Sequence, residues 1–368
     1  MTAYIARVVL ENFQSHGRTE LVLVPGFNVL VGESNQGKSS VLRALVWLFY
    51  NEPCGTAFIR SGRDWCRVSL EYSDGTALSR TRTRARNSYL ILYPGGASRT
   101  FETSDAEVPQ EVRGVHGIAP VLLADGVLAA INVSRQFDQP FLLTEPEDVR
   151  AEAIGRLRGA HVADRALDGC LSALQEGVAR GAGEEDVRVL EQACRLLAQS
   201  SASVRESARR DVEDFVNSAL RFIFGPEPTF KIGFARRDPK IVCEFSIVSS
   251  SGAVPLEGIL QESQGAGIVD VISLALRIAF LEGHQPRLPG PLLLDEPVKH
   301  LSDQYALGLS RFLKTVADTF DRQIVMATHD QHLTAAADML YVFERREGET
   351  FVHSRGSSIR GYVRRPGS

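Results

Sequence analysis

Apolar and polar residues alternate near the start of the chain and then change to a helical spacing. Residues 20–31, ELVLVPGFNVLV, alternate and then run apolar, with Pro25 and Gly26 between the two halves. This pattern predicts two strands around a turn, the second of them buried. Residues 38–50, KSSVLRALVWLFY, carry apolar side chains on most helical faces and predict a mostly buried helix.

The same patterns return later in the chain. Apolar runs at 292–294 and 324–327 predict two more buried strands, and residues 260–281 predict a small polar loop followed by an apolar helix. Residues 145–180 and 187–222 each carry a helical apolar stripe, and glycine turn signals separate them. The middle of the chain therefore predicts an antiparallel helical hairpin, with a helical subdomain packed on the rest of the protein as the alternative.

Between the second predicted strand and the first predicted helix lies VGESNQGKSS, residues 31–40, which contains the full GxxxxGK[ST] pattern. In a strand–loop–helix context, the backbone N–H groups of such a loop surround phosphate oxygens, the lysine reaches the β- and γ-phosphates, and the hydroxyl ligates Mg²⁺. We therefore expect a nucleoside triphosphate site. Its candidate phosphate-binding residues are Gly32, Asn35, Gly37, Lys38, Ser39 and Ser40.

Acidic and imidazole side chains follow the two later strands. Asp295 and Glu296 end the first, where one carboxylate can hold the Mg²⁺ shell and the other can polarise the attacking water. His329 ends the second, and the carboxyl ends of such strands face the ligand crevice of an α/β sheet. Ser263 and Gly265 lie at the start of the apolar helix, where a glycine-containing N-cap is the simpler interpretation.

Charge and cysteine content limit the partners and the cellular compartment that we expect for this protein. The net charge is -4, so any binding to nucleic acid depends on local basic patches. The five cysteines are scattered with no CxxC, which is typical of reduced thiols in a cytosolic protein. The sequence contains neither a long apolar span nor the apolar core of a signal peptide. We therefore expect a cytoplasmic protein that does not cross a membrane.

The order of these motifs resembles ABC-type ATPase heads, and the N-terminal segment resembles the SMC, SbcC and RecF class of DNA-repair ATPases. In that class an NFxSH segment precedes the phosphate loop, as NFQSH does here at residues 12–16. The resemblance implies an α/β fold: a P-loop ATPase head with an antiparallel β-layer and an inserted antiparallel helical hairpin. It predicts an N-terminal lobe over 1–150, a hairpin over 151–222 and a C-terminal lobe over 223–368.

The resemblance also implies roles for particular residues. Gln136 resembles the Q-loop glutamine that contacts Mg²⁺ and the attacking water, with Gln139 as the second candidate. It implies that Glu296 is the general base and that His329 contacts the γ-phosphate. The remaining assignments are Lys38 for phosphate, Ser39 and Asp295 with Gln136 for Mg²⁺, and Ser263 with Gly265 for the nucleotide of a second head.

Three positions differ from the pattern of that class. Residues 262–266 read Glu-Ser-Gln-Gly-Ala where the class has Leu-Ser-Gly-Gly followed by Gln or Glu. Ser302 stands where aspartate is usual, and Gln14 stands where arginine is common. The long coiled-coil arms of the class are also missing, since the hairpin is short, and a naturally short-armed relative and an engineered deletion are both open.

An arginine-rich segment, SRTRTRARNSY, places positive charge at every second position. In a strand, the guanidinium groups of Arg80, Arg82, Arg84 and Arg86 would share one face, which suits a phosphate backbone. A solvated face of the β-layer is the alternative interpretation.

Together these features predict an ATP- and Mg²⁺-dependent ATPase of DNA repair or chromosome maintenance, working as a head dimer that holds two ATP molecules and binds DNA. Two alternatives remain at this stage. One is a nucleotide-switched scaffold for a protein partner such as a nuclease, and the other is an ABC transporter subunit.

Overall fold

The computed structural model describes residues 3–103, 107–237, 240–250, 252–256 and 265–356. The chain divides into two compact units that interleave along the sequence. Unit 1 comprises residues 1–120, 132–138 and 289–368, and unit 2 comprises residues 121–131 and 139–288.

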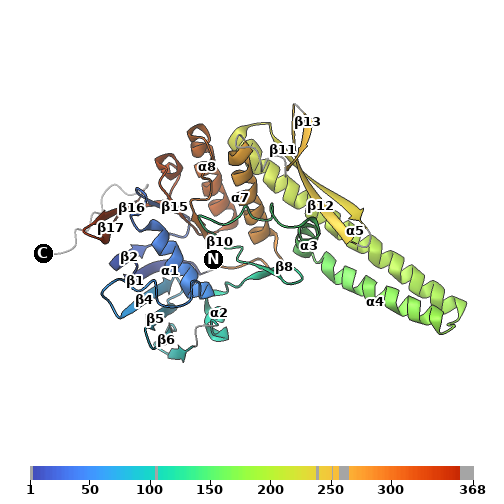
Figure 1. Cartoon of the computed structure of the whole chain (residues 1–368), viewed down its shortest axis with the longest axis horizontal. Coiled ribbons are helices and arrows are strands. Elements are labelled where there is room, and N and C mark those ends of the chain that lie inside the picture. The colour runs from blue at the N-terminus through green and yellow to red at the C-terminus, as the bar shows by residue number, and fades with distance from the viewer. Residues whose placement is uncertain (1–2, 104–106, 238–239, 251, 257–264, 357–368) are drawn as a thin grey trace. The chain divides into compact units, whose positions relative to one another are not determined.

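Unit 1 is built around a sheet that joins distant parts of the chain (Figure 1). Its order is β10-β14-β15-β3-β16-β17, and every neighbouring pair is parallel except β16 and β17. The predicted strands β3, β14 and β15 are wholly buried and adjacent, which agrees with their uninterrupted apolar sequences. The strands are β10 (Val133–Ser134), β14 (Leu292–Asp295), β15 (Ile324–Thr328), β3 (Phe27–Val31), β16 (Met339–Arg346) and β17 (Glu349–Gly356).

A second sheet of unit 1 is antiparallel throughout, in the order β2-β1-β4-β5-β6-β7. Its strands are β1 (Ile5–Phe13), β2 (His16–Val22), β4 (Trp65–Tyr72), β5 (Ala77–Thr83), β6 (Asn87–Leu92) and β7 (Ser98–Glu102). Helix α1 (Lys38–Tyr50) contacts strands of both sheets, which explains why most of its side chains are buried. The other helices are α2 (Gln110–His116), α8 (Asp303–Phe320) and the 3-10 turn η2 (Gln331–Thr334). The expected α/β head with an antiparallel layer is confirmed.

The arginine segment does not form one exposed face. Arg80 is 1% exposed, because the face of β5 that carries it is covered by α1. Its guanidinium lies 4.1 Å from the ring centroid of Trp47 and 4.8 Å from that of Tyr89, and it donates to Asn87 and Asn51. The prediction that Arg80 contacts DNA is therefore wrong, since the side chain belongs to the core.

The rest of the segment also departs from the predicted strand. Strand β5 ends at Thr83, so Arg84 and Arg86 lie in the turn to β6 and are exposed. Thr83 closes this turn by a backbone hydrogen bond from its N–H to the carbonyl of Arg86, 2.8 Å. Arg82 is still in the strand and half-buried. Only Arg84 and Arg86 of the set are thus fully open to solvent.

Unit 2 contains the helical hairpin, formed by α4 (Ala160–Ala179) and α5 (Glu184–Phe224). Arg205 of α5 pairs with Asp164 of α4 at 2.7 Å, and the Sγ atoms of Cys170 and Cys194 lie 2.8 Å apart. The first predicted helix is broken: α3 (Glu147–Leu157) is separate, since Gly159 has a φ of 82° and interrupts the helical path. At about 1.5 Å per residue, α4 is about 30 Å long and α5 about 60 Å.

The remaining elements of unit 2, among the residues that the structure describes, are two small antiparallel sheets and helix α7. The three-stranded sheet contains β11 (Thr229–Arg237), β12 (Lys240–Ser249) and β13 (Gly252–Pro255), and the other contains β8 (Val121–Ala124) and β9 (Val127–Ala129). Helix α7 (Ala266–Gly283) is apolar and contacts α5. It corresponds to the apolar helix predicted within 260–281.

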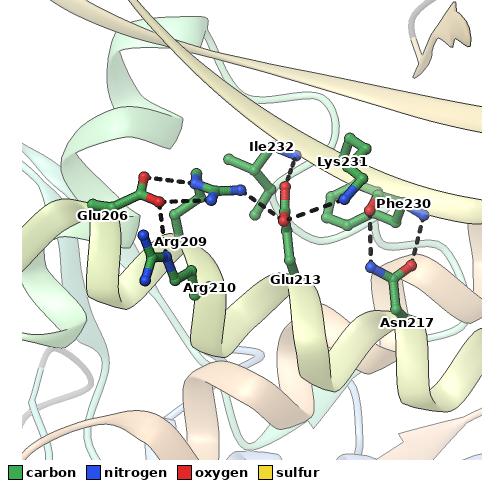
Figure 2. A network of polar contacts seen from close by, with 8 residues as sticks. All are labelled: Glu206, Arg209, Arg210, Glu213, Asn217, Phe230, Lys231 and Ile232. Atoms are coloured by element: carbon green, nitrogen blue, oxygen red, sulfur yellow. Dashed lines mark hydrogen bonds and ion pairs between the residues drawn. The ribbon is translucent and has the colours of Figure 1, made fainter.

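A polar network joins the C-terminal half of α5 to β11 (Figure 2). Glu213, which is 6% exposed, accepts from the backbone N–H of Ile232 at 2.5 Å and pairs with Arg209 at 2.7 Å. One turn further on, Asn217 forms two hydrogen bonds with the backbone of Phe230, of 2.7 and 2.9 Å. These side chains complete the edge of β11, so α5 replaces a neighbouring strand there.

Replacing Glu213 with alanine is expected to lower the free energy of unfolding by about 2–4 kcal/mol, because the substitution leaves a buried N–H without an acceptor and Arg209 with one carboxylate fewer. Glu206→Ala is the matched control, since Glu206 also pairs with Arg209 but its side chain is 41% exposed. Its loss should cost less than about 1 kcal/mol. Urea unfolding of both variants measures the difference, and equal losses would contradict a special role for Glu213.

Candidate functional site

A cavity of about 330 Å³ lies in unit 1, at the carboxyl ends of the parallel strands. It is lined by four residues of the loop over residues 32–37, called the glycine loop below, and by the start of α1. Gln136 and Glu296 reach the cavity from the loops that follow β10 and β14. The structure therefore brings together segments separated by more than two hundred residues. The predicted residues on its wall are Asn35, Gly37, Lys38, Ser39, Ser40, Gln136 and Glu296.

Lys38 is buried within the glycine loop. Its ammonium donates to the carbonyls of Gly32 and Glu33, at 2.7 and 2.8 Å. Burial lowers the pKa of Lys38, while the carboxylates of Glu296 and Asp295 oppose this shift. Gly32 and Gly37 have φ values of 156° and 102°, and a β-carbon on Gly37 would lie 2.5 Å from the hydroxyl of Thr350. The loop thus has space for glycine alone at position 37.

The loop and the strand β14 meet at Ser39 and Asp295. The Ser39 hydroxyl donates to Oδ1 of Asp295 at 2.8 Å. Burial raises the pKa of Asp295, and the Ser39 hydrogen bond and the charge of Arg43 oppose it. A cation beside this carboxylate would relieve the cost of burying it, and a hydroxyl with a carboxylate is the oxygen donor set that Mg²⁺ prefers. The two residues therefore fit a Mg²⁺ site.

Glu296 follows directly and has a left-handed backbone with a φ of 49°. One of its carboxylate oxygens accepts from Nδ1 of His329 at 2.9 Å, and the other accepts from the Thr328 hydroxyl at 3.3 Å. His329 borders an adjoining cavity of about 420 Å³, to which Glu296 also contributes. The structure therefore holds an acid and an imidazole in contact at the edge of the cavity that Glu296 lines with Lys38.

The NFQSH segment, residues 12–16, contacts the glycine loop through the side chain of His16. Nε2 of His16 lies 3.0 Å from the carbonyl of Gly37, and Nδ1 lies 2.7 Å from the Thr19 hydroxyl. Burial lowers the pKa of His16 to about 4, so the ring is neutral at pH 7. Since a carbonyl only accepts, Nε2 carries the proton and Nδ1 accepts from Thr19. His16 thus positions the loop and does not contact the cavity.

Sequence reasoning missed several residues around the loop. Thr350 on β17 donates to the carbonyl of Gln36 at 3.1 Å, and its hydroxyl lies 2.8 Å from that of Ser15. Arg43 and Arg345 also line the cavity. No local pattern marks Thr350 or Arg345, because their positions depend on the pairing of β16 with β3 and of β17 with β16. Arg43 could have been found from its place one helical turn after Ser39.

Four predicted positions are not among the described residues that line this cavity: Gly32, Gly265, Asp295 and His329. Ser263 lies outside the described residues, and Gly265 precedes α7 in unit 2. Gln139, the second candidate for the Q-loop glutamine, is exposed and belongs to unit 2, whereas Gln136 lines the cavity. In the part of the chain that the structure describes, no cluster of three or more metal-binding side chains is present. Within the same residues, every helix is too short or too polar to cross a membrane.

The chain matches known proteins over parts of its sequence. A family model described as an AAA domain matches residues 7–101. The chain is 30% identical over 129 residues to the DNA replication and repair protein RecF of Streptomyces avermitilis, which covers 35% of this chain and 33% of that protein. The chain thus spans about a third of the length of this curated relative.

Solved structures resemble the chain over almost its full length. The Smc head domain of Pyrococcus furiosus, bound to the C-terminal domain of ScpA, aligns with a TM-score of 0.66 and 14% identity, over 96% of this chain and 97% of that one. The Smc head of Pyrococcus yayanosii aligns with a TM-score of 0.65 and 13% identity, over 96% and 97%. The SMC head of Thermotoga maritima gives 0.52 and 17%, over 95% and 98%. At these identities the likeness concerns the fold.

Proposed function

We propose that this chain, which has the fold of an SMC- and RecF-like ABC-type ATPase head, is a Mg²⁺-dependent ATPase of DNA repair or chromosome maintenance. The observation that carries the proposal is the 2.8 Å hydrogen bond between Ser39 and Asp295. It joins Ser39, which lines the same cavity as Lys38 and Glu296, to the acidic end of β14. A phosphate loop and a carboxylate pair in this relation are the parts that phosphoryl transfer requires.

Each residue then has a defined task. Lys38 would exchange the carbonyls of Gly32 and Glu33 for phosphate oxygens, which also relieves the cost of burying its charge. Ser39 and Asp295, with Gln136, would hold Mg²⁺, which neutralises charge on the phosphate oxygens when bound. Backbone N–H groups at the start of α1 would complete the phosphate contacts.

Hydrolysis needs a base for the attacking water, and Glu296 is the group placed to act as one. Its carboxylate lines the cavity, and His329 and Thr328 orient it by donating to its two oxygens. It would accept a proton from water as the water attacks the terminal phosphate. In this scheme His329 is released toward the γ-phosphate when nucleotide binds.

We further propose that two heads form an ATP-dependent dimer. Ser263 and Gly265 of one copy would contact the nucleotide held by the other, as the resemblance to ABC-type heads implies. DNA is the proposed partner, supported by the name of the RecF relative and by the exposed arginines at the β5–β6 turn. Arg84, whose side chain is 80% exposed, and Arg86 are the arginines in that turn.

ATP hydrolysis measured with and without double-stranded DNA, across a salt series, tests this function. Stimulation by DNA should fall as salt rises, because phosphate contacts release counterions. The double variant Arg84→Ala/Arg86→Ala should lose most of the stimulation and keep its basal rate.

Arg180→Ala/Arg195→Ala is the matched control, since these arginines are similarly exposed, at 79% and 71%, but lie on the hairpin. Basal hydrolysis that ignores DNA at every salt concentration would remove DNA from the proposal. A nucleotide switch acting on a protein partner such as a nuclease would then be the better account.

A further inference from the structure

A second cation stands beside the phosphate-binding lysine. Arg43 lies on α1, one helical turn after Ser39 and therefore on the same side of the helix. Its Nη1 donates to Oε1 of Gln14 at 2.9 Å, and both residues line the same cavity as Lys38. This arginine is not part of the GxxxxGK[ST] pattern.

Gln14 holds this guanidinium without neutralising it. The residue occupies the tight turn between β1 and β2 with a φ of 49°, and its backbone N–H donates to the carbonyl of Phe58 at 2.8 Å. The backbone of Gln14 is therefore held in place, which fixes where its side chain begins. An amide oxygen is a neutral acceptor, so it can orient a guanidinium while the full positive charge remains available.

The pairing of Arg43 differs from that of Arg7 and Arg60, two other arginines of unit 1. Arg7 bonds to two glutamates at 2.8 Å, and Arg60 lies 3.6 Å from Glu349. Arg43, by contrast, has no carboxylate within ion-pair distance among the residues that the structure describes. A guanidinium held by an amide in a concave site is prepared for an external anion, and its planar donors match phosphate oxygens.

The charges on the cavity wall also favour the binding of an anion. The cationic side chains there are Lys38, Arg43 and Arg345, and Glu296 is the one acidic side chain among the described lining residues. A concave surface with this excess of positive charge attracts polyphosphates. Gln14 also stands where arginine is common in the ATPase class that the sequence resembles. The positive charge is thus retained at this place, although it comes from α1.

We propose that Arg43 is a second phosphate-binding residue of the nucleotide site, positioned by Gln14, and that α1 supplies the guanidinium in place of the turn between β1 and β2. This inference rests on the proposed nucleotide site and adds a residue that binds the polyphosphate directly. The contact is with phosphate oxygens, so it does not depend on the base or the ribose.

Equilibrium binding of ATP and of inorganic tripolyphosphate, each with Mg²⁺, tests the proposal. Arg43→Gln is expected to weaken both ligands by about 10- to 100-fold, the effect of losing charge-assisted hydrogen bonds. The double variant Gln14→Arg/Arg43→Gln, which returns the guanidinium to the turn, should recover binding to within about threefold. Arg311→Gln, at an exposed position of α8, is the control and should bind as the wild type does.

The outcomes separate this inference from the proposed function. Wild-type protein that binds neither ligand, and is no different from Lys38→Ala, would overturn the nucleotide site and this inference together. Wild-type binding that is lost in Lys38→Ala but unchanged in Arg43→Gln would overturn the role of Arg43 alone. Loss of ATP binding with normal tripolyphosphate binding would place Arg43 on the nucleoside and also overturn the proposal. No recovery in the double variant would overturn the inference that α1 supplies the guanidinium in place of the turn between β1 and β2.

Discussion

Glu296→Gln is expected to lower the turnover of ATP by about 10²- to 10⁴-fold, the usual contribution of a positioned general base. The amide keeps the size of the side chain and can still meet the hydroxyl of Thr328, but it cannot accept the proton of the attacking water. Nucleotide affinity should change little, because Lys38, Ser39 and Asp295 are untouched. Single-turnover hydrolysis and equilibrium binding, measured on the same preparation, separate these two effects.

Glu347→Gln is a suitable control, because this glutamate is exposed in the turn between β16 and β17. It should hydrolyse ATP at the wild-type rate. If Glu296→Gln retained normal turnover, another group would have to be the base. The same variant with ATP and Mg²⁺ should accumulate as a dimer in light scattering, since hydrolysis would no longer release the two heads. A nucleotide-bound monomer would contradict the head dimer.

Arg80→Ala is expected to lower the free energy of unfolding by about 3–5 kcal/mol, the largest loss of stability expected for any arginine of the segment. The substitution would open a cavity between Trp47 and Tyr89 and remove the hydrogen bonds that Arg80 donates to Asn51 and Asn87. Both consequences arise in the core shared by α1 and the antiparallel sheet. Urea unfolding, with a second probe to test two-state behaviour, measures the loss.

Arg84→Ala provides the comparison, because it removes the same charge four residues later from a side chain that is 80% exposed. Its effect on stability should be within about 0.5 kcal/mol. Arg80→Lys should lie between the two, since a lysine keeps the charge but loses the planar fork that reaches several acceptors. Equal stability of Arg80→Ala and Arg84→Ala would show that Arg80 is not needed by the core.

In the hairpin, the periodic apolar pattern predicted the helices but not the break between α3 and α4. The apolar stripe predicted two antiparallel helices, and α4 with α5 agree with it. The same stripe ran on through residues 145–159, where the structure has a separate helix α3 and then Gly159 at a φ of 82°. Periodicity reports which residues face a partner, and it continues across a break when both helices pack on the same neighbours.

The sequence by itself determined those elements whose conformation depends on contiguous residues. The glycine loop, α1 and the buried strands β3, β14 and β15 follow from contiguous residues, because backbone conformation and continuous burial are encoded within each segment. The grouping of Lys38 with Asp295 and Glu296 was expected from the motif order, and their catalytic roles remain proposals.

Only the tertiary structure decided how side chains from separate segments are used. Arg80 is a core residue because α1 covers its face of β5, and nothing within the arginine segment states which face is covered. Thr350 supports the glycine loop because β17 pairs beside β16, more than three hundred residues from that loop. Arg43 contacts Gln14 because α1 packs close to the turn between β1 and β2, which comes earlier in the chain. Such contacts depend on the packing of whole elements, so a linear pattern cannot contain them.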